Sequence, residues 1–199
     1  MSTIGDEPYS RPAMDEYFMG IAMAVRRRAN CTGNRVGAVI VKDHHIVSTG
    51  YNGTPHGMTN CMEGGCHRCA HRDEYPSGVG YDLCICVHAE QNAILQAARF
   101  GIAVEGSTMY TTMRPCFGCT KELLQARVDT VYYLHDWRYP DEARNTEYER
   151  LQGHFRGGIR QLVMPDPDEV WAISSKRYAA AGAVGAVAEG SDELGHSGG

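Results

Sequence analysis

The sequence contains no run of about 18 apolar residues, the length that a helix needs to cross a membrane. Its first stretch, MSTIGDEPYSRPAMDEY, lacks the basic and then apolar pattern of a secretory signal peptide. Positive charge is not in excess, and the formal net charge of −5 gives no basis for binding nucleic acid through bulk electrostatics. We therefore expect a cytoplasmic protein that binds neither membranes nor nucleic acid.

The chain has no internal repeat, and its 199 residues suffice for one well-buried domain with an appendage. From about Ala179 onward the sequence is rich in Ala, Gly and Ser and lacks Lys and Arg. Such a composition is typical of a flexible tail. We expect one domain at 1–170, with a Cys/His-rich insertion at about 52–86, and a largely flexible C-terminal segment at 171–199.

Hydrophobic periodicity predicts an α/β fold. A helical period runs from Met14 to Ala29, and Arg26, Arg27 and Arg28 at its end suit the negative pole of the helix dipole, the alternative being a phosphate site. VGAVIV and HIVSTGY read as a β-hairpin. Helices and strands then alternate from Ala89 to Leu134, and GIRQLVM adds a possible further strand. This order predicts a three-layer α/β/α sandwich with a mixed central sheet.

All eight cysteines fall between Cys31 and Cys119. In a reducing compartment, such clustering favours metal ligation or catalysis over disulfides. His88 lies at the start of one predicted helix, and Cys116 and Cys119 lie three residues apart on the first turn of the next. Three N/S ligands are the number that a catalytic zinc ion uses when water fills its fourth position. Glu90 is then placed beside that water as a proton carrier, and H-x-E…P-C-x-x-C is the signature of zinc deaminases.

The segments HAEQNAI, GSTMYTTMRPCFGC and VGAVIVKDHHIVSTGYNGTPHG together resemble the deoxycytidylate (dCMP) deaminases of the cytidine deaminase-like superfamily. The resemblance covers roughly Met14 to Leu134. It implies hydrolytic deamination of dCMP to dUMP, feeding thymidylate synthesis, in which zinc-activated water attacks C4 and Glu90 carries protons. It also implies a homo-oligomer, with a hexamer favoured, and Mg²⁺ bound with an allosteric nucleotide.

The resemblance further implies that Asn52 and Ala89 line the nucleotide pocket. Tyr133 is either a contact to the base or sugar or a simple core aromatic residue. Arg114 departs from the family pattern, and it either reaches the substrate phosphate or is solvated.

The remaining cysteines predict one additional structural zinc. Relatives with such a site imply Cys31, Cys61 and Cys86 as ligands, whereas spacing alone could close a four-thiolate site from Cys66, Cys69, Cys84 and Cys86. The two sets compete for Cys86 unless two further metals bind. His71 is a further candidate ligand.

Two other functions stay open. The chain could deaminate another cytosine nucleoside or a modified nucleotide, because phosphate and C5 selectivity depend on the shape of the pocket. It could also be a non-catalytic, zinc-stabilised binding module. Glu90 argues against the second, because a structural zinc site has no use for it.

Overall fold

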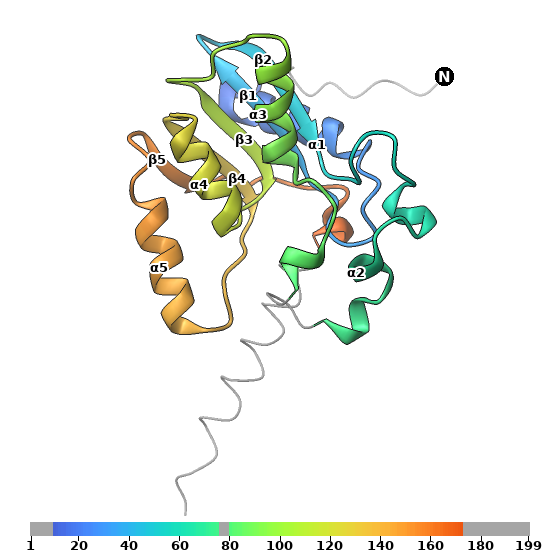
Figure 1. The fold of residues 1–199 in the computed structure, drawn as a ribbon. Helices are drawn as coiled ribbons and strands as arrows, with labels where there is room; N and C mark the ends of the chain where they lie inside the picture. The colour runs from blue at the N-terminus through green and yellow to red at the C-terminus, as the bar shows by residue number, and fades with distance from the viewer. Residues whose placement is uncertain (1–9, 76–79, 173–199) are drawn as a thin grey trace, which may run out of the picture.

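The computed structural model describes residues 10–75 and 80–172, and within them five strands form one sheet in the order β2-β1-β3-β4-β5 (Figure 1). The strands are β1 (Gly37–Lys42), β2 (His45–Tyr51), β3 (Thr108–Met113), β4 (Thr130–His135) and β5 (Gly158–Gln161). β1 runs antiparallel to both β2 and β3, whereas β3, β4 and β5 are parallel. The mixed sheet predicted from the sequence is confirmed.

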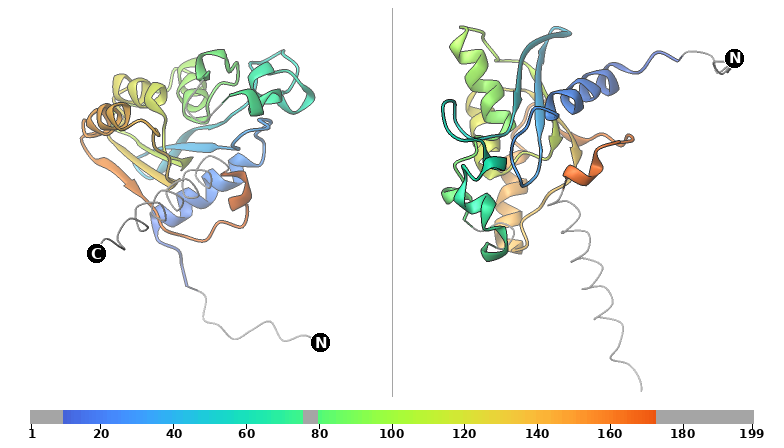
Figure 2. Two further views of the ribbon diagram at one scale, coloured as in Figure 1. Left: turned by 90° about the horizontal axis from the view of Figure 1, so that it is seen from below. Right: turned by 90° about the vertical axis from the view of Figure 1, so that its right-hand side faces the viewer.

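Helices cover both faces of this sheet, which gives the three layers seen in Figure 2. One face carries α1 (Met14–Arg26). The other face carries α3 (Ala89–Arg99), α4 (Phe117–Gln125) and α5 (Glu142–Gln152). The predicted α/β/α sandwich is therefore correct.

The side chains of the interior strand β1 enter two core clusters, because successive side chains of a strand point to opposite faces. Val39 and Val41 belong to the cluster under α1, together with Phe18 and Met19. Ala38 and Ile40 belong to the cluster under α3 and α4. Both faces of β1 are buried, and this explains the nearly continuous apolar run that marks the strand in the sequence.

The predicted insertion at 52–86 is built from short helices. They are η1 (Cys61–Glu63), α2 (His67–Ala70), η2 (Arg72–Glu74) and η3 (Tyr81–Leu83). A last turn, η4 (Glu169–Trp171), leads into Ala172, which is buried in the core. Trp171 and Ala172 thus belong to the fold, and the rest of the predicted C-terminal segment lies outside the described residues. No helix in the described ranges combines the length and apolar character of a membrane span.

Helix α5 was not predicted from the sequence. Its residues, EARNTEYERLQ, contain few apolar side chains, and only Tyr148 and Gln152 are buried. Asp141 caps the helix by accepting a hydrogen bond from the Arg144 amide at 2.8 Å. This N-cap is the one local signal that could have revealed the helix.

Two glycines allow the helices to approach the sheet closely. A Cβ atom at Gly37 would lie 2.2 Å from the Ala22 carbonyl oxygen of α1. A Cβ atom at Gly50 would lie 2.1 Å from the Ala89 carbonyl oxygen and 2.4 Å from the Ala93 nitrogen of α3. The backbone of β2 therefore touches the first turns of α3, the helix that begins directly after His88.

We expect Gly50→Ala to lower the free energy of unfolding by about 1–3 kcal/mol or more, because the added methyl group meets backbone atoms that cannot rotate away. Gly20→Ala is the matched control. Gly20 lies within α1, and a Cβ atom there would meet nothing within 4 Å. Since alanine favours helix over glycine, Gly20→Ala should raise stability by up to about 1 kcal/mol. Equal urea midpoints for the two variants would contradict this account of the β2–α3 contact.

Candidate active site

Two helices begin at the same edge of the sheet. β2 and β3 point the same way, since both are antiparallel to β1, so their C-terminal ends share one edge. Val87 pairs with Gly53 just beyond β2, and His88 then forms the N-cap of α3. Cys116, shortly after β3, forms the N-cap of α4. The topology thus brings the starts of α3 and α4 together, as the sequence predicted.

The side chains at these two helix starts meet. Nδ1 of His88 lies 3.5 Å from Sγ of Cys116 and 3.4 Å from Sγ of Cys119. Zn–S bonds of about 2.3 Å and Zn–N bonds of about 2.0–2.1 Å at tetrahedral angles separate N from S by about 3.5 Å. The three ligand atoms lie close together as a set. Their chemistry and their spacing both fit a single zinc ion.

The ionisation of this set also suits a metal. Hydrogen bonding with Cys119, together with that of His88, holds the pKa of Cys116 well below that of an ordinary thiol. Burial by itself lowers the pKa of His88, but its hydrogen bond with Cys116 raises that pKa to about 9. These contacts therefore favour the thiolate of Cys116, the form that binds a metal, and a proton on the His88 ring. A zinc ion would displace the ring proton from Nδ1.

Glu90 is a buried carboxyl group beside the three ligands. Its residue is 4% exposed, and burial raises the pKa of the carboxyl group. The Thr111 hydroxyl donates a hydrogen bond of 3.0 Å to Oε1. The other oxygen, Oε2, lies 3.6 Å from Sγ of Cys119. Thr111 thus fixes one oxygen and leaves the other facing the candidate metal site.

Helix α5 supports the loop that carries the two cysteines. The Pro115 carbonyl oxygen accepts hydrogen bonds from the Tyr148 hydroxyl at 2.6 Å and from Nε2 of Gln152 at 3.2 Å. Gln152 also accepts a bond from Nε of Arg114 at 2.9 Å. Sequence reasoning missed both residues, because the helix that carries them has almost no apolar pattern.

A cavity of about 120 Å³ opens onto the candidate metal site. The predicted residues Asn52, His88, Ala89, Glu90 and Cys116 all contribute to its wall. Trp137, which the sequence did not single out, also lines it, whereas Tyr133 is not among the lining residues. The Tyr133 ring instead lies 5.5 Å from the guanidinium carbon of Arg114. Tyr133 is therefore better described as the core aromatic of the two roles considered for it.

Asn52 and Arg114 line the cavity but are already engaged with the protein. Asn52 Oδ1 accepts from the Val36 amide and its Nδ2 donates to the Asn34 carbonyl, both at 2.8 Å. Arg114 forms a salt bridge of 3.0 Å with Asp136, and its side chain is only 9% exposed. Arg114 is thus not solvated. Asn52 holds the chain before β1 against the end of β2, and this shapes the cavity wall.

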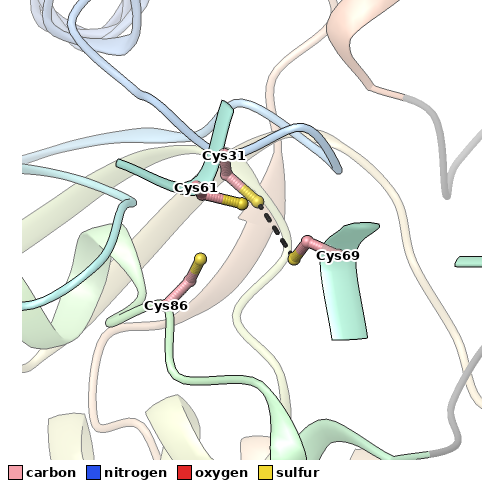
Figure 3. Close-up of side chains that lie close together, drawn as sticks. All are labelled: Cys31, Cys61, Cys69 and Cys86. Atoms are coloured by element: carbon pink, nitrogen blue, oxygen red, sulfur yellow. Dashed lines mark hydrogen bonds between the residues drawn. The ribbon is translucent and has the colours of Figure 1, made fainter. Parts of the chain in front are cut away.

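The six other cysteines form one cluster, and four of them line the same cavity. Figure 3 shows the sulfur atoms of Cys31, Cys61, Cys69 and Cys86 turned toward one another. A second set consists of Cys66, Cys69, Cys84 and Cys86. Each set can surround one metal ion, so both ligand sets considered from the sequence are brought together. His71 does not join them, because it is exposed, stacks on His67, and directs Nδ1 at the His67 carbonyl oxygen.

Comparison with known proteins gives consistent matches. Residues 12–135 match the family described as the cytidine and deoxycytidylate deaminase zinc-binding region. The chain is 39% identical over 136 residues to a deoxycytidylate deaminase of Saccharomyces cerevisiae, a match that covers 68% of this chain and 42% of that protein. It is also 39% identical over 132 residues to a deoxycytidylate deaminase of Mycobacterium phage D29, covering 62% of this chain and 96% of that protein.

A solved structure shares the fold. It is the crystal structure of dCMP deaminase from the cyanophage S-TIM5 in complex with dCMP and dUMP, with 30% sequence identity and a TM-score of 0.57. The match covers 78% of this chain and 100% of that chain. By contrast, the region matched in the yeast protein is less than half of its length.

Proposed function

This chain belongs to the cytidine and deoxycytidylate deaminase zinc-binding family, and on that basis we propose that it converts dCMP to dUMP by hydrolytic deamination, releasing ammonia. The observation that carries the proposal is the buried carboxyl group of Glu90 beside the ligand set of His88, Cys116 and Cys119. A purely structural metal site gives no reason to keep a carboxyl group buried there. The relatives named deoxycytidylate deaminase and the cyanophage enzyme bound to dCMP and dUMP support the same substrate.

In the proposed reaction, different residues of the candidate site bind the metal and transfer protons. His88, Cys116 and Cys119 would hold zinc, which supplies a water molecule acidified to a pKa of about 7. Glu90 Oε1 is fixed by Thr111, so Oε2 is the atom that accepts a proton from water and passes it to N3 of the cytosine ring. The C4–O bond forms, and Glu90 then takes the remaining proton from the new C4 hydroxyl group. It delivers this proton to the amino group as the C4–N bond breaks and the C4 carbonyl forms. The products are dUMP and ammonia.

The cavity wall also favours a phosphorylated substrate. Three guanidinium groups line it, from Arg68, Arg72 and Arg114. Guanidinium groups suit phosphate because their planar donors match its oxygens. Asn52 and Ala89, which both line the cavity, complete our proposed substrate-binding set together with Trp137.

The proposal is tested by measuring ammonia release from dCMP, deoxycytidine, CMP and dCTP at equal concentrations. We expect kcat/KM to be highest for dCMP, and to fall most steeply for deoxycytidine, which lacks the phosphate. The highest value for deoxycytidine would reassign the substrate to a nucleoside. No release from any of the four would favour a non-catalytic, zinc-stabilised binding module.

Further parts of the proposal concern the whole protein. We propose at least one structural zinc among the six clustered cysteines, and a homo-oligomer, with a hexamer favoured by the family resemblance. We also propose regulation by an allosteric nucleotide with Mg²⁺ and a cytoplasmic location. The catalytic domain expected at 1–170, with an insertion at about 52–86, would extend to include Trp171 and the buried Ala172. Size-exclusion chromatography with light scattering tests the assembly.

A further inference from the structure

The insertion at 52–86 is organised around sulfur. Among the described residues, its core cluster consists of five buried cysteines and the partly buried Cys84, with no Leu, Ile, Val, Phe or Met. The six residues come from four separate segments of the chain and are Cys31, Cys61, Cys66, Cys69, Cys84 and Cys86. Short helices with so little apolar side-chain area cannot be held together by a hydrophobic core. Something bound to the thiols must supply the missing stabilisation.

The distances between the sulfur atoms indicate which kind of ligand the thiols bind. Sγ of Cys69 lies 3.8 Å from Sγ of Cys31 and 3.7 Å from Sγ of Cys84, and the sulfurs of Cys66 and Cys84 are 3.9 Å apart. A disulfide would require about 2.05 Å. A tetrahedral site with Zn–S bonds of about 2.3 Å separates its sulfurs by about 3.8 Å. The observed spacing fits thiolates arranged around zinc.

The two sets of four cysteines have two members in common. One contains Cys31 and Cys61, the other contains Cys66 and Cys84, and both contain Cys69 and Cys86. Six thiolates can satisfy two four-coordinate ions only if two of them are shared. The structure provides two shared sulfurs and two unshared sulfurs on each side.

We propose that the six cysteines bind two zinc ions as one cluster, in which the thiolates of Cys69 and Cys86 bridge the ions. Compared with a single ion, the second Zn²⁺ replaces two thiol protons, so the net charge of the cluster does not change. Backbone donors accommodate the negative sulfurs, since the Gly33 amide lies 3.3 Å from Sγ of Cys31 and the Thr32 amide 3.5 Å from Sγ of Cys61. A single ion would leave two thiols beside it without a role, either those of Cys31 and Cys61 or those of Cys66 and the half-buried Cys84.

The cluster would act by positioning the active site. Cys86 lies two residues before His88, and Val87 between them pairs with Gly53 after β2. Four of the six cysteines also line the cavity that contains Glu90. Both ions would therefore fix the wall of the cavity and the start of α3. This inference does not depend on the substrate, because it concerns only metal content and geometry.

The test measures zinc per chain in the purified full-length protein by mass spectrometry of the metal, with X-ray absorption at the zinc edge. We expect about three zinc ions per chain and a zinc–zinc scattering shell. Cys116→Ser should remove only the candidate catalytic ion, leaving about two ions with all-sulfur coordination and the same zinc–zinc shell. About two ions in the wild type without a zinc–zinc shell would overturn the proposal.

Two matched variants distinguish the shared two-zinc cluster from a single ion in either ligand set. Cys61→Ser and Cys66→Ser each remove one unshared ligand from a different ion, so each should lose about one zinc. If a single ion occupied the first set, Cys66→Ser would keep the full zinc content; if it occupied the second, Cys61→Ser would keep it. Either result would refute a shared cluster, and the wild-type absorption measurement decides the question should a variant fail to fold. A protein with three zinc ions but no deaminase activity would contradict only the proposed function.

Discussion

Replacing Glu90 by Gln is expected to lower kcat for dCMP by about 10²–10⁴-fold, the usual contribution of a positioned general acid–base group. The amide has nearly the same size and can still contact the Thr111 hydroxyl, but it cannot accept and return a proton. Glu90 lies outside the set formed by His88, Cys116 and Cys119, so zinc content should not change. Steady-state kinetics and metal analysis of the same preparation provide the measurement.

Glu105→Gln is the control for this substitution. Glu105 is exposed and forms a surface salt bridge with Arg127, far from the cavity. Its loss should leave kcat within about twofold of the wild type, because surface ion pairs contribute little even to stability. Turnover by Glu90→Gln comparable to that of this control would exclude Glu90 as the proton carrier.

Replacing Asp166 by Asn is expected to lower the free energy of unfolding by about 3–5 kcal/mol, because it removes the closer of two carboxylates from a buried cation and leaves only Asp168, at 3.9 Å. Arg26 is fully buried and binds Asp166 through two bonds, of 2.8 Å from Nη1 and 2.5 Å from Nη2. His135 Nε2 lies 2.6 Å from the same carboxylate. These contacts tie the chain after β5 to α1 across more than 100 residues of sequence. Urea denaturation at neutral pH measures the loss.

The same carboxylate makes stability depend on pH. Burial opposes ionisation of Asp166, but the hydrogen bonds from Arg26 and His135 prevail and hold its pKa well below its usual range. A depressed folded-state pKa means that the stabilisation is present above the unfolded-state pKa of about 3.9 and is lost as pH falls below it. The Asn variant should therefore lose the part of the acid sensitivity that Asp166 contributes.

Arg27→Ala is the matched control for the buried pair. The Arg27 side chain is 65% exposed and reaches Asp168 at 3.3 Å, so its removal should cost no more than about 1 kcal/mol. If Asp166→Asn cost no more than Arg27→Ala, the buried ion pair would not be a main source of stability.

The sequence predicted the helices and strands whose apolar residues follow a regular period. Alternating and periodic apolar residues identified β1, β2, α1 and α3, because these elements bury a regular face. Helix α5 was missed because it buries only Tyr148 and Gln152. Arg26 was assigned to the helix dipole along with its two neighbours, whereas it forms a buried ion pair. No local sequence pattern predicts an ion-pair partner 140 residues away.

The candidate site likewise contains residues that the sequence predicted and residues that it did not. His88, Glu90, Cys116 and Cys119 were identifiable because two helix starts at one sheet edge must lie close together. Trp137 follows β4 in a segment without periodicity, so nothing in the sequence connected it with the cavity. For the other cysteines, the family resemblance implied one ligand set and the spacing another, and the two sets competed for Cys86. Only the three-dimensional arrangement shows that the two sets share Cys69 as well.

The most direct test of the central proposal is to follow the oxygen that enters the product. The wild-type protein is incubated with dCMP in ¹⁸O-labelled water, and dUMP and ammonia are quantified together by mass spectrometry and a coupled assay. Hydrolytic deamination should place one ¹⁸O atom at C4 of each dUMP and release one ammonia per dUMP. Unchanged dCMP, or dUMP without the label, would contradict the account.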